Sequence, residues 1–252
     1  MKKWIILSIL FSMQSEAASV GTYRIYLDSE HRQQKFMVKN NSADHEKCNI
    51  SFDYMAYEEG GGEVIKLSSE EKVALSTPAT KRLRYSPRQF TIKPKSAQYV
   101  AFNYKRQIND NPAEYRTYAN IKCLKVDPLV KEGLNLTPSI MHSVPLVIRT
   151  GKSTDLEANL VFSQIKQLAN RVAFRLEHQG NRSVYGDLHL INANGDKLKL
   201  LQKNIVIYPE MKYKNFNFSL AGFNSKNMKV VFQETGNYSA IKQFSLPLKG
   251  KL

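Results

Sequence analysis

The residues that could do catalytic chemistry are scattered along this 252-residue chain. The five histidines (His31, His45, His142, His178 and His189) have neither HExxH nor HxH spacing. The stretch from Gly151 to Thr154 ends like a phosphate-binding loop, but Leu146 stands where that motif needs its leading glycine. The chain also lacks a Gly-x-Ser-x-Gly nucleophile motif. These observations argue against an enzyme, and they indicate neither a metal site nor a cofactor.

The chain has two cysteines, Cys48 and Cys123. Their separation is not that of a metal site, and no histidine cluster accompanies them. In an oxidising compartment an even pair is most simply a disulfide, with two free buried thiols as the alternative.

An apolar pattern between residues 134 and 149 points to binding instead of catalysis. In an extended strand, residues two apart share a face. One face would therefore carry Leu134, Leu136, Pro138, Ile140, Val144, Leu146 and Ile148. Such a strand would span about 50 Å, and a long exposed apolar strand is prone to pair with another chain. We interpret it as a strand that lends apolar side chains to a partner; the alternative is that these residues pack into their own domain core.

The N-terminus has the pattern of a secretory signal peptide. Lys2 and Lys3 precede a short apolar run, and Ser15 and Ala17 suit cleavage after residue 17. An uncleaved anchor is the alternative. Without residues 1–17, 35 basic and 21 acidic residues leave a net charge of +14. Nucleic acid is not the expected partner, because no basic block, zinc spacing or recognition helix is evident. No later segment approaches 18 consecutive apolar residues, so stable membrane insertion is not expected.

The rest of the chain predicts short strands separated by polar turns, which is typical of β-sandwiches. We expect two domains, residues 18–150 and 151–252, because the polar segment Thr150–Asp155 follows the long strand. Gly60-Gly-Gly62 ends a strand that begins near Cys48, and Asn192-Ala-Asn-Gly195 predicts a hairpin turn. No segment has sustained helical periodicity, although residues 156–173 come closest. If Cys48 opens the third strand and Cys123 closes the sixth strand of an immunoglobulin-like sandwich, a disulfide across neighbouring strands becomes possible.

Three motifs resemble the signatures of the periplasmic pilus (fimbrial) assembly chaperones, in the same order and spacing. They are Arg84-Tyr-Ser-Pro-Arg-Gln-Phe-Thr-Ile-Lys-Pro94, Glu114-Tyr-Arg-Thr117 and Ser143-Val-Pro-Leu-Val-Ile-Arg149. The resemblance covers about residues 20–150 by motif, and the rest by length and strand content. It implies an all-β fold of two immunoglobulin-like domains in a boomerang shape. It also implies donor-strand complementation, in which the long strand fills a groove in an incomplete pilin subunit that is later delivered to an outer-membrane usher.

The resemblance also assigns candidate site residues. The donor side chains would be Leu134, Leu136, Pro138 and Ile140, of which Pro138 fits least because it lacks a backbone donor. Arg24 matches the arginine that holds the subunit's terminal carboxylate. The lysine that usually assists it is replaced by Pro145, so Arg116 or Arg84 is the candidate for the second charge. Arg149 also matches the family, although a structural salt bridge explains it equally well.

The competing interpretation is a secreted adhesin or structural protein that uses its strands only for its own fold. Self-association of the free protein through the apolar strand is also left open. No cofactor is expected under either interpretation.

Overall fold

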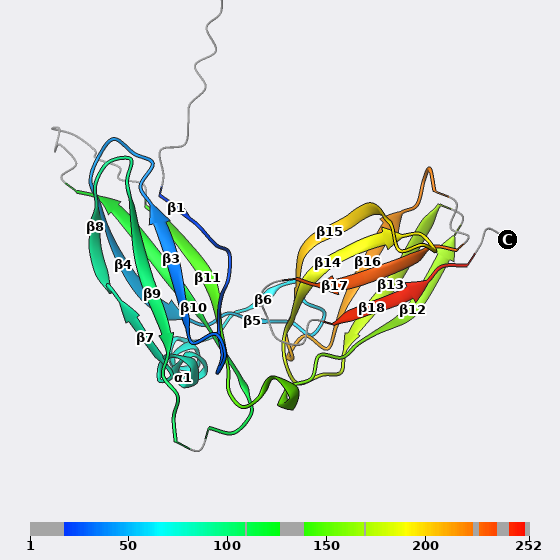
Figure 1. The fold of residues 1–252 in the computed structure, drawn as a ribbon, viewed down its shortest axis with the longest axis horizontal. Coiled ribbons are helices and arrows are strands. Elements are labelled where there is room, and N and C mark those ends of the chain that lie inside the picture. The colour runs from blue at the N-terminus through cyan, green and yellow to red at the C-terminus, as the bar shows by residue number, and fades with distance from the viewer. Residues whose placement is uncertain are drawn as a thin grey trace, which may run out of the picture.

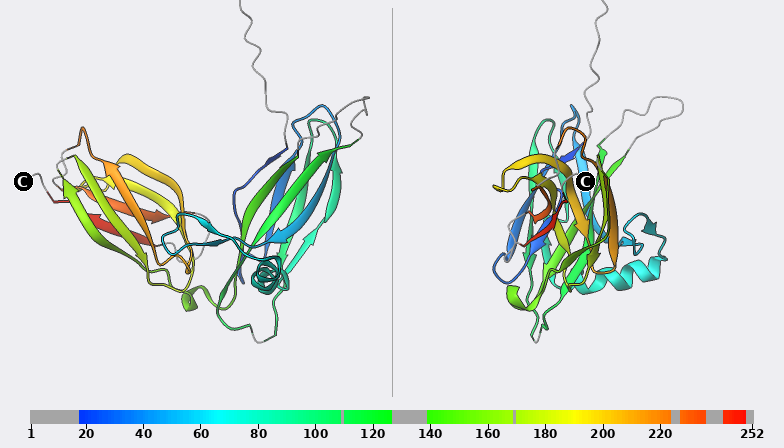
Figure 2. Two further views of the ribbon diagram at one scale, coloured as in Figure 1. Left: turned by 180° about the vertical axis from the view of Figure 1, so that it is seen from behind. Right: turned by 90° about the vertical axis from the view of Figure 1, so that its right-hand side faces the viewer.

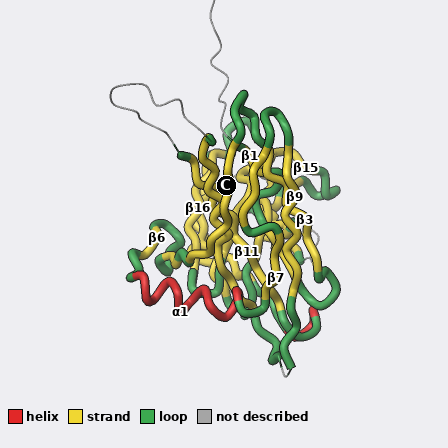
Figure 3. Tube along the Cα trace, turned by 90° about the vertical axis from the view of Figure 1, so that its left-hand side faces the viewer, coloured by secondary structure: helices red, strands yellow, loops and turns green. Residues whose placement is uncertain are grey.

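The computed structural model describes residues 18–108, 110–126, 139–168, 170–223, 227–235 and 242–249. The candidate signal peptide lies outside these residues, as do Leu134, Leu136 and Pro138. Strands dominate the described chain (Figure 3). Among the described residues, no helix has the length and apolar character needed to cross a membrane.

The first domain is a sandwich of two sheets. One sheet has the order β1 (Ser19–Val20), β3 (Gln33–Lys39), β9 (Ala97–Tyr104) and β7 (Leu83–Ser86). The other sheet has the order β2 (Ile25–Leu27), β11 (Ile140–Arg149), β10 (Glu114–Lys125), β4 (Glu46–Asp53) and β8 (Gln89–Ile92). Alternate residues of these strands point between the sheets, where they form one continuous core that includes Phe36, Phe102, Ile121, Leu146 and Ile148.

The predicted disulfide is confirmed. Cys48 and Cys123 lie directly opposite each other on β4 and β10, with their α-carbons 4.1 Å apart. The antiparallel pairing of these two strands brings together residues that are 75 positions apart in the chain.

Between β4 and β7 the chain leaves the sandwich and forms a small hairpin and a helix. The hairpin pairs β5 (Ala56–Tyr57) with β6 (Val64–Ile65). The helix, α1 (Ser69–Thr80), packs against β10 and projects to one side of the first domain (Figure 2). The expectation that no helix would be present was wrong. The buried residues of α1 are Ser76 and Ala79, so no apolar stripe marks this helix in the sequence.

The second domain is also a two-sheet sandwich. One sheet has the order β12 (Leu160–Leu168), β13 (Arg171–His178) and β16 (Tyr213–Ser219). The other has the order β15 (Lys197–Ile207), β14 (Val184–Ile191), β17 (Lys229–Glu234) and β18 (Gln243–Pro247). The predicted turn at Asn192–Gly195 joins β14 and β15, and Gly195 has the positive φ of +89° that such a turn requires. The strand β12 occupies the segment that came closest to helical periodicity.

The two sandwiches lie at an angle to each other (Figure 1), joined by the short helix η1 (Ser153–Asp155). Each has its own hydrophobic core. The predicted fold class, two immunoglobulin-like sandwiches in a boomerang arrangement, is confirmed.

Candidate functional site

The edge of β11 carries the described part of the candidate donor strand. Ile140 is its first residue and is 46% exposed, although it shares the parity of the core residues Val144 and Leu146. On one side β11 pairs with β10 along its whole length. On the other side β2 pairs only with Leu146–Ile148. Among the described residues, no strand therefore pairs with 140–145 on the β2 side.

Residues 140–145 (Ile-Met-His-Ser-Val-Pro) contain no acidic or basic side chain apart from His142. Natural sheets usually protect a free edge with lysines, bulges or a covering segment. The edge strand β15 of the second domain shows this protection, because it has three register shifts and exposed lysines at Lys197, Lys199 and Lys203. The β11 edge lacks such charges, so it is better suited to accept a partner strand.

Arg24 immediately precedes β2 and faces the second domain. Its guanidinium carbon lies 4.6 Å from the ring centre of Tyr185 and 5.9 Å from that of Tyr208. The residue is only 9% exposed, and its Nε has no hydrogen-bond partner among the described residues. A buried cation that touches aromatic faces but lacks an acceptor is a suitable site for an anion, above all for a carboxylate.

Arg116, the other candidate anchor, already holds a carboxylate of its own chain. From β10 its Nη1 donates to Oε2 of Glu210 at 3.1 Å, and its Nη2 forms an ion pair with Oε1 of the same residue. Nη2 also donates to the Tyr54 hydroxyl and to the Met55 carbonyl, each at 3.0 Å. Burial by itself would lower the pKa of Arg116, but Glu210 raises it, so Arg116 stays charged. A role for Arg116 in anchoring a partner stays a prediction.

The alternative candidate, Arg84, has an exposed side chain on β7, which belongs to the sheet without β2 and β11. It is therefore not brought together with Arg24.

Arg149 forms a structural salt bridge, as one of the two interpretations of the sequence predicts. Its Nε donates to Glu114 at 2.8 Å and its Nη2 donates to the Ser183 carbonyl at 2.9 Å. The Ser183 amide in turn donates to Glu114 at 3.0 Å, so this buried pair ties the two domains together. Burial by itself would raise the pKa of Glu114, but Arg149 and the Ser183 amide hold it below the ordinary value.

Three tyrosine hydroxyls lie in a chain, partly buried, beside Arg24 and Arg116. The Tyr118 hydroxyl lies 3.2 Å from that of Tyr57 and 3.2 Å from that of Tyr208. Burial raises the pKa of Tyr118, so its side chain stays a neutral phenol. The Arg116 guanidinium carbon lies 3.6 Å from the ring centre of Tyr208. No sequence pattern marks these tyrosines, since only the folded chain brings positions 57, 118 and 208 together.

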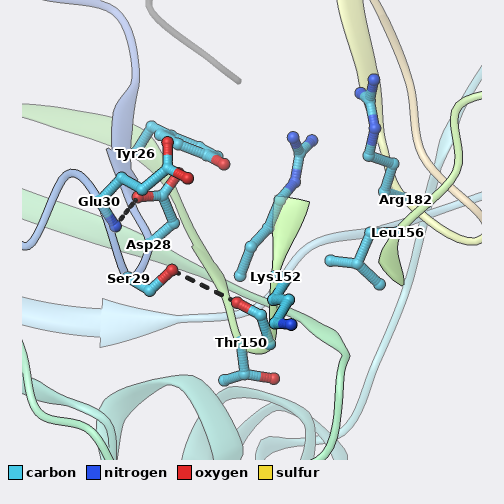
Figure 4. A pocket seen from close by; sticks show the side chains of 10 residues that line it. Tyr26, Asp28, Ser29, Glu30, Thr150, Lys152, Leu156 and Arg182 are labelled. Carbon is cyan, nitrogen blue, oxygen red and sulfur yellow. Dashed lines mark hydrogen bonds between the residues drawn. The ribbon is translucent and has the colours of Figure 1, made fainter. Parts of the chain in front are cut away.

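A small pocket opens between the domains and is lined by Tyr26, Asp28, Arg149 and Thr150 from the first and by Leu156 and Arg182 from the second (Figure 4). Both arginines that line this pocket are paired, Arg149 with Glu114 and Arg182 with Glu234. Asp28 accepts a hydrogen bond from the Glu30 amide at 2.7 Å (Figure 4). Unlike Arg24, the two arginines of this pocket are therefore already neutralised by carboxylates of the chain, and Lys152 is the further basic residue that lines it.

Among the described residues, the group of potential metal ligands is Glu46 with Cys48 and Cys123. Both sulfurs belong to the disulfide, so this group offers no thiolate to a metal ion.

Neither the protein-family models nor the sequences of curated proteins give a match. Solved structures do match, over nearly the whole chain. The SafB chaperone of Salmonella enterica, solved in complex with the SafA pilin, is 13% identical with a TM-score of 0.50, covering 94% of this chain and 99% of SafB. The DraB chaperone of E. coli is 12% identical with a TM-score of 0.48, covering 92% of this chain and 98% of DraB. The CupB2 chaperone of Pseudomonas aeruginosa is 14% identical with a TM-score of 0.47, covering 91% of this chain and 100% of CupB2.

Because the sequence identity to SafB is only 13%, this similarity shows the fold alone. The chain has the two-domain β-sandwich fold of the SafB chaperone.

Proposed function

We propose that this protein is a periplasmic chaperone that binds pilin subunits by donor-strand complementation and delivers them to an outer-membrane usher. The observation that carries the proposal is the edge of β11 at residues 140–145, with which no described strand pairs on the β2 side. Beside it, just before β2, lies the buried Arg24, whose Nε has no hydrogen-bond partner among the described residues. The fold supports it, because SafB has this fold and was solved with a pilin. The protein needs no catalytic activity or cofactor for this role.

The β11 edge supplies two kinds of interaction. Its free N–H and C=O groups pair with a strand of the subunit, which extends the sheet across the two molecules. Ile140, together with Leu134, Leu136 and Pro138 before it in the chain, fills the apolar groove of a subunit that lacks its final strand. The alternation of these side chains sets the register, because a shift of one residue would turn them all away from the groove.

Arg24 fixes the end of the bound subunit. We assign it the terminal carboxylate, which a planar guanidinium can bind through two parallel hydrogen bonds. Tyr185 and Tyr208 enclose the guanidinium and keep it poorly hydrated, which strengthens its interaction with an anion. Pro145, at the position of the usual lysine, adds neither a charge nor an N–H group, so Arg24 carries this task.

We also propose a signal peptide and a boundary between the two domains. Residues 1–17 act as a cleaved signal that brings the protein to the periplasm. The domain boundary lies at residues 150 and 151, between β11 and the short helix η1.

Co-expression with a candidate pilin encoded by a neighbouring gene tests the donor role. Ile140→Asp places a charge in the subunit's groove, and we expect it to reduce the co-purified complex at least about tenfold, because burying an unpaired carboxylate costs several kcal/mol. Ile108→Asp is the matched control, since Ile108 is 94% exposed in the β9–β10 connection. Equal recovery with both variants would overturn the donor role.

The anchor is tested with the same pair of proteins. Arg24→Gln keeps hydrogen-bonding capacity but removes the charge, and it should weaken binding of a pilin with a free terminal carboxylate. The same substitution should have little effect on a pilin whose C-terminus is extended by one glycine-serine pair, which moves the carboxylate away. Equal weakening for both pilins would show that Arg24 does not bind the carboxylate.

A further inference from the structure

The Gly60-Gly-Gly62 segment forms the tip of the β5–β6 hairpin, and this hairpin reaches from the first domain to the second (Figures 1 and 2). We call residues 56–65 the interdomain hairpin. Its turn is closed by hydrogen bonds from the Glu58 amide to the Glu63 carbonyl (3.1 Å) and from the Gly61 amide to the Glu58 carbonyl (2.8 Å). The hairpin takes no part in the β11 edge, so the proposed function does not account for it.

The base of the hairpin packs on the core of the second domain through Tyr57. The Tyr57 ring is stacked on the Tyr208 ring, with the ring centres 5.6 Å apart. Its hydroxyl lies 3.2 Å from that of Tyr118, which belongs to the first domain. Tyr57 thus connects β10 of one domain with the turn that follows β15 of the other.

The tip of the hairpin packs on the same turn of the second domain. The Tyr213 amide donates to the Glu59 carbonyl at 3.1 Å, and Lys212 forms an ion pair with the Glu59 carboxylate. A β-carbon at Gly61, where φ is +65°, would lie 3.2 Å from the sulfur of Met211. A β-carbon at Gly60 would lie 3.3 Å from the Tyr213 ring. Glycine therefore permits both the bend and the close approach of the two domains.

The turn held by the hairpin, residues 208–213, also supplies the contacts of both candidate arginines. Tyr208 lies against Arg24 and Arg116, and Glu210 binds Arg116. Arg24, Arg116 and the interdomain hairpin all belong to the first domain, and they contact this turn of the second domain at separate points.

We propose that the interdomain hairpin is a clamp that fixes the angle between the domains and thereby positions Tyr185 and Tyr208 around Arg24. Domains joined by one linker and a small interface move relative to each other unless something holds them. The positioning of Arg24 rests on the proposed function, whereas the fixed angle does not. Tyr57, Gly60 and Gly61 are the positioning residues, since they pack against this turn and would act on Arg24 through it.

The angle is measured on the free, full-length protein by pulsed electron spin resonance, with spin labels at Lys35→Cys and Lys203→Cys. Both positions are exposed, one on each domain. Two clamp variants are compared with the parent: Tyr57→Ala, and a shortened hairpin in which an Asn-Gly turn replaces residues 58–63. An Asn-Gly turn suits a two-residue hairpin, so the shortened variant keeps the Tyr57–Val64 pair and removes the tip.

We expect each clamp variant to widen the distance distribution about twofold, because the Glu114 and Arg116 contacts alone then restrain the angle between the domains. Tyr57→Phe keeps the stacked ring and should restore most of the parent's narrow distribution. Gly62→Ala is the control for the tip, since a β-carbon there meets nothing within 4 Å. Circular dichroism must show native strand content in every variant compared. A parent-like distribution in both folded clamp variants would overturn the proposal.

Binding of the candidate pilin supplies a second readout. If the competent angle falls to about a tenth of the population, the apparent affinity falls about tenfold. The loss should be larger for the pilin with a free terminal carboxylate than for the extended pilin, because the clamp acts through Arg24. Failure of the parent to bind any pilin would refute the proposed function and leave the spin-label result standing. If the spin-label distance distribution widens but the affinity for the pilin is unchanged, the clamp fixes the angle between the domains and its effect on Arg24 is refuted.

Discussion

At the scale of single residues, Glu114 joins the two domains because its carboxylate accepts hydrogen bonds from both of them. Arg149 donates to it from β11 of the first domain and the Ser183 amide donates to it from the second. Both charged side chains are buried. Removing one partner of a buried ion pair leaves the other charge uncompensated, which costs far more than losing an exposed pair.

Glu114→Gln should therefore lower the free energy of unfolding by about 3 kcal/mol at pH 7. Asp44→Asn is the matched control, because the Asp44–Lys125 pair is exposed and should contribute less than about 1 kcal/mol. Urea unfolding followed by circular dichroism measures both values. Similar losses for the two variants would show that burial of the Glu114 pair has no special effect.

The same pair gives a pH dependence whose sign follows from the pKa of Glu114. Arg149 and Ser183 lower this pKa from the ordinary value of 4.5, so the ionised carboxylate favours the folded state. The contribution is complete above pH 4.5 and is lost as the pH falls through the lower, folded-state pKa. The stability difference between the parent and Glu114→Gln should accordingly shrink below pH 4.5.

Single residues also show what sequence can and cannot predict about the site. Arg24 and Arg149 were identified from their motif positions, and the structure buries Arg24 and leaves its Nε without a hydrogen-bond partner among the described residues. Tyr185 and Tyr208, which lie against Arg24, and Ser183, which binds Arg149, belong to the other domain. No local pattern marks them, since their role depends on the angle between the domains.

At the scale of elements, helix α1 has a clear start signal in the sequence, but other features of the same segment argue against a helix. Ser68 accepts a hydrogen bond from the Glu71 amide and Glu71 accepts one from the Ser68 amide, which is a capping box. Pro78 and the absence of an apolar stripe argue against a helix in the sequence. In the structure Pro78 lies inside α1, two residues before its last residue Thr80. The strands were predicted better, because their alternation reflects burial on one face of each sheet.

Ser68→Ala should destabilise α1 and lower the free energy of unfolding by about 1 kcal/mol, because it leaves the first turn without its cap. Ser69→Ala, one residue along, should be close to neutral, because alanine is the stronger helix former and the cap stays intact. Hydrogen exchange of the α1 amides, read alongside urea unfolding, locates the loss. Equal protection of α1 in both variants would show that the capping box does not support the helix.

The edges of β15 and β11 show how far the sequence predicts a binding surface. Lysines and register shifts protect β15, and residues 140–145 of β11 have neither. The sequence predicted the apolar character of this strand, whereas its unpaired side could be recognised only once β2 was seen to pair with residues 146–148 alone.

At the scale of the whole molecule, the two domains have separate cores but shared contacts. The core of the first lies within residues 18–148. The core of the second lies within residues 158–248, and Tyr57 of the interdomain hairpin packs against it. The disulfide belongs entirely to the first domain, where it closes a loop of 75 residues.

Replacing both cysteines, Cys48→Ala with Cys123→Ala, should therefore act on one domain. A loop of this length makes the disulfide worth about 4 kcal/mol, mainly because it restricts the unfolded chain. Alanine suits the buried positions better than serine, because it adds no unpaired hydroxyl to the core. Differential scanning calorimetry should show the transition of the first domain at a lower temperature, while that of the second domain shifts little. If both transitions fell together by the same amount, the clamp and the Glu114 pair would be joining the two sandwiches into a single cooperative unit, and the domains would not unfold independently.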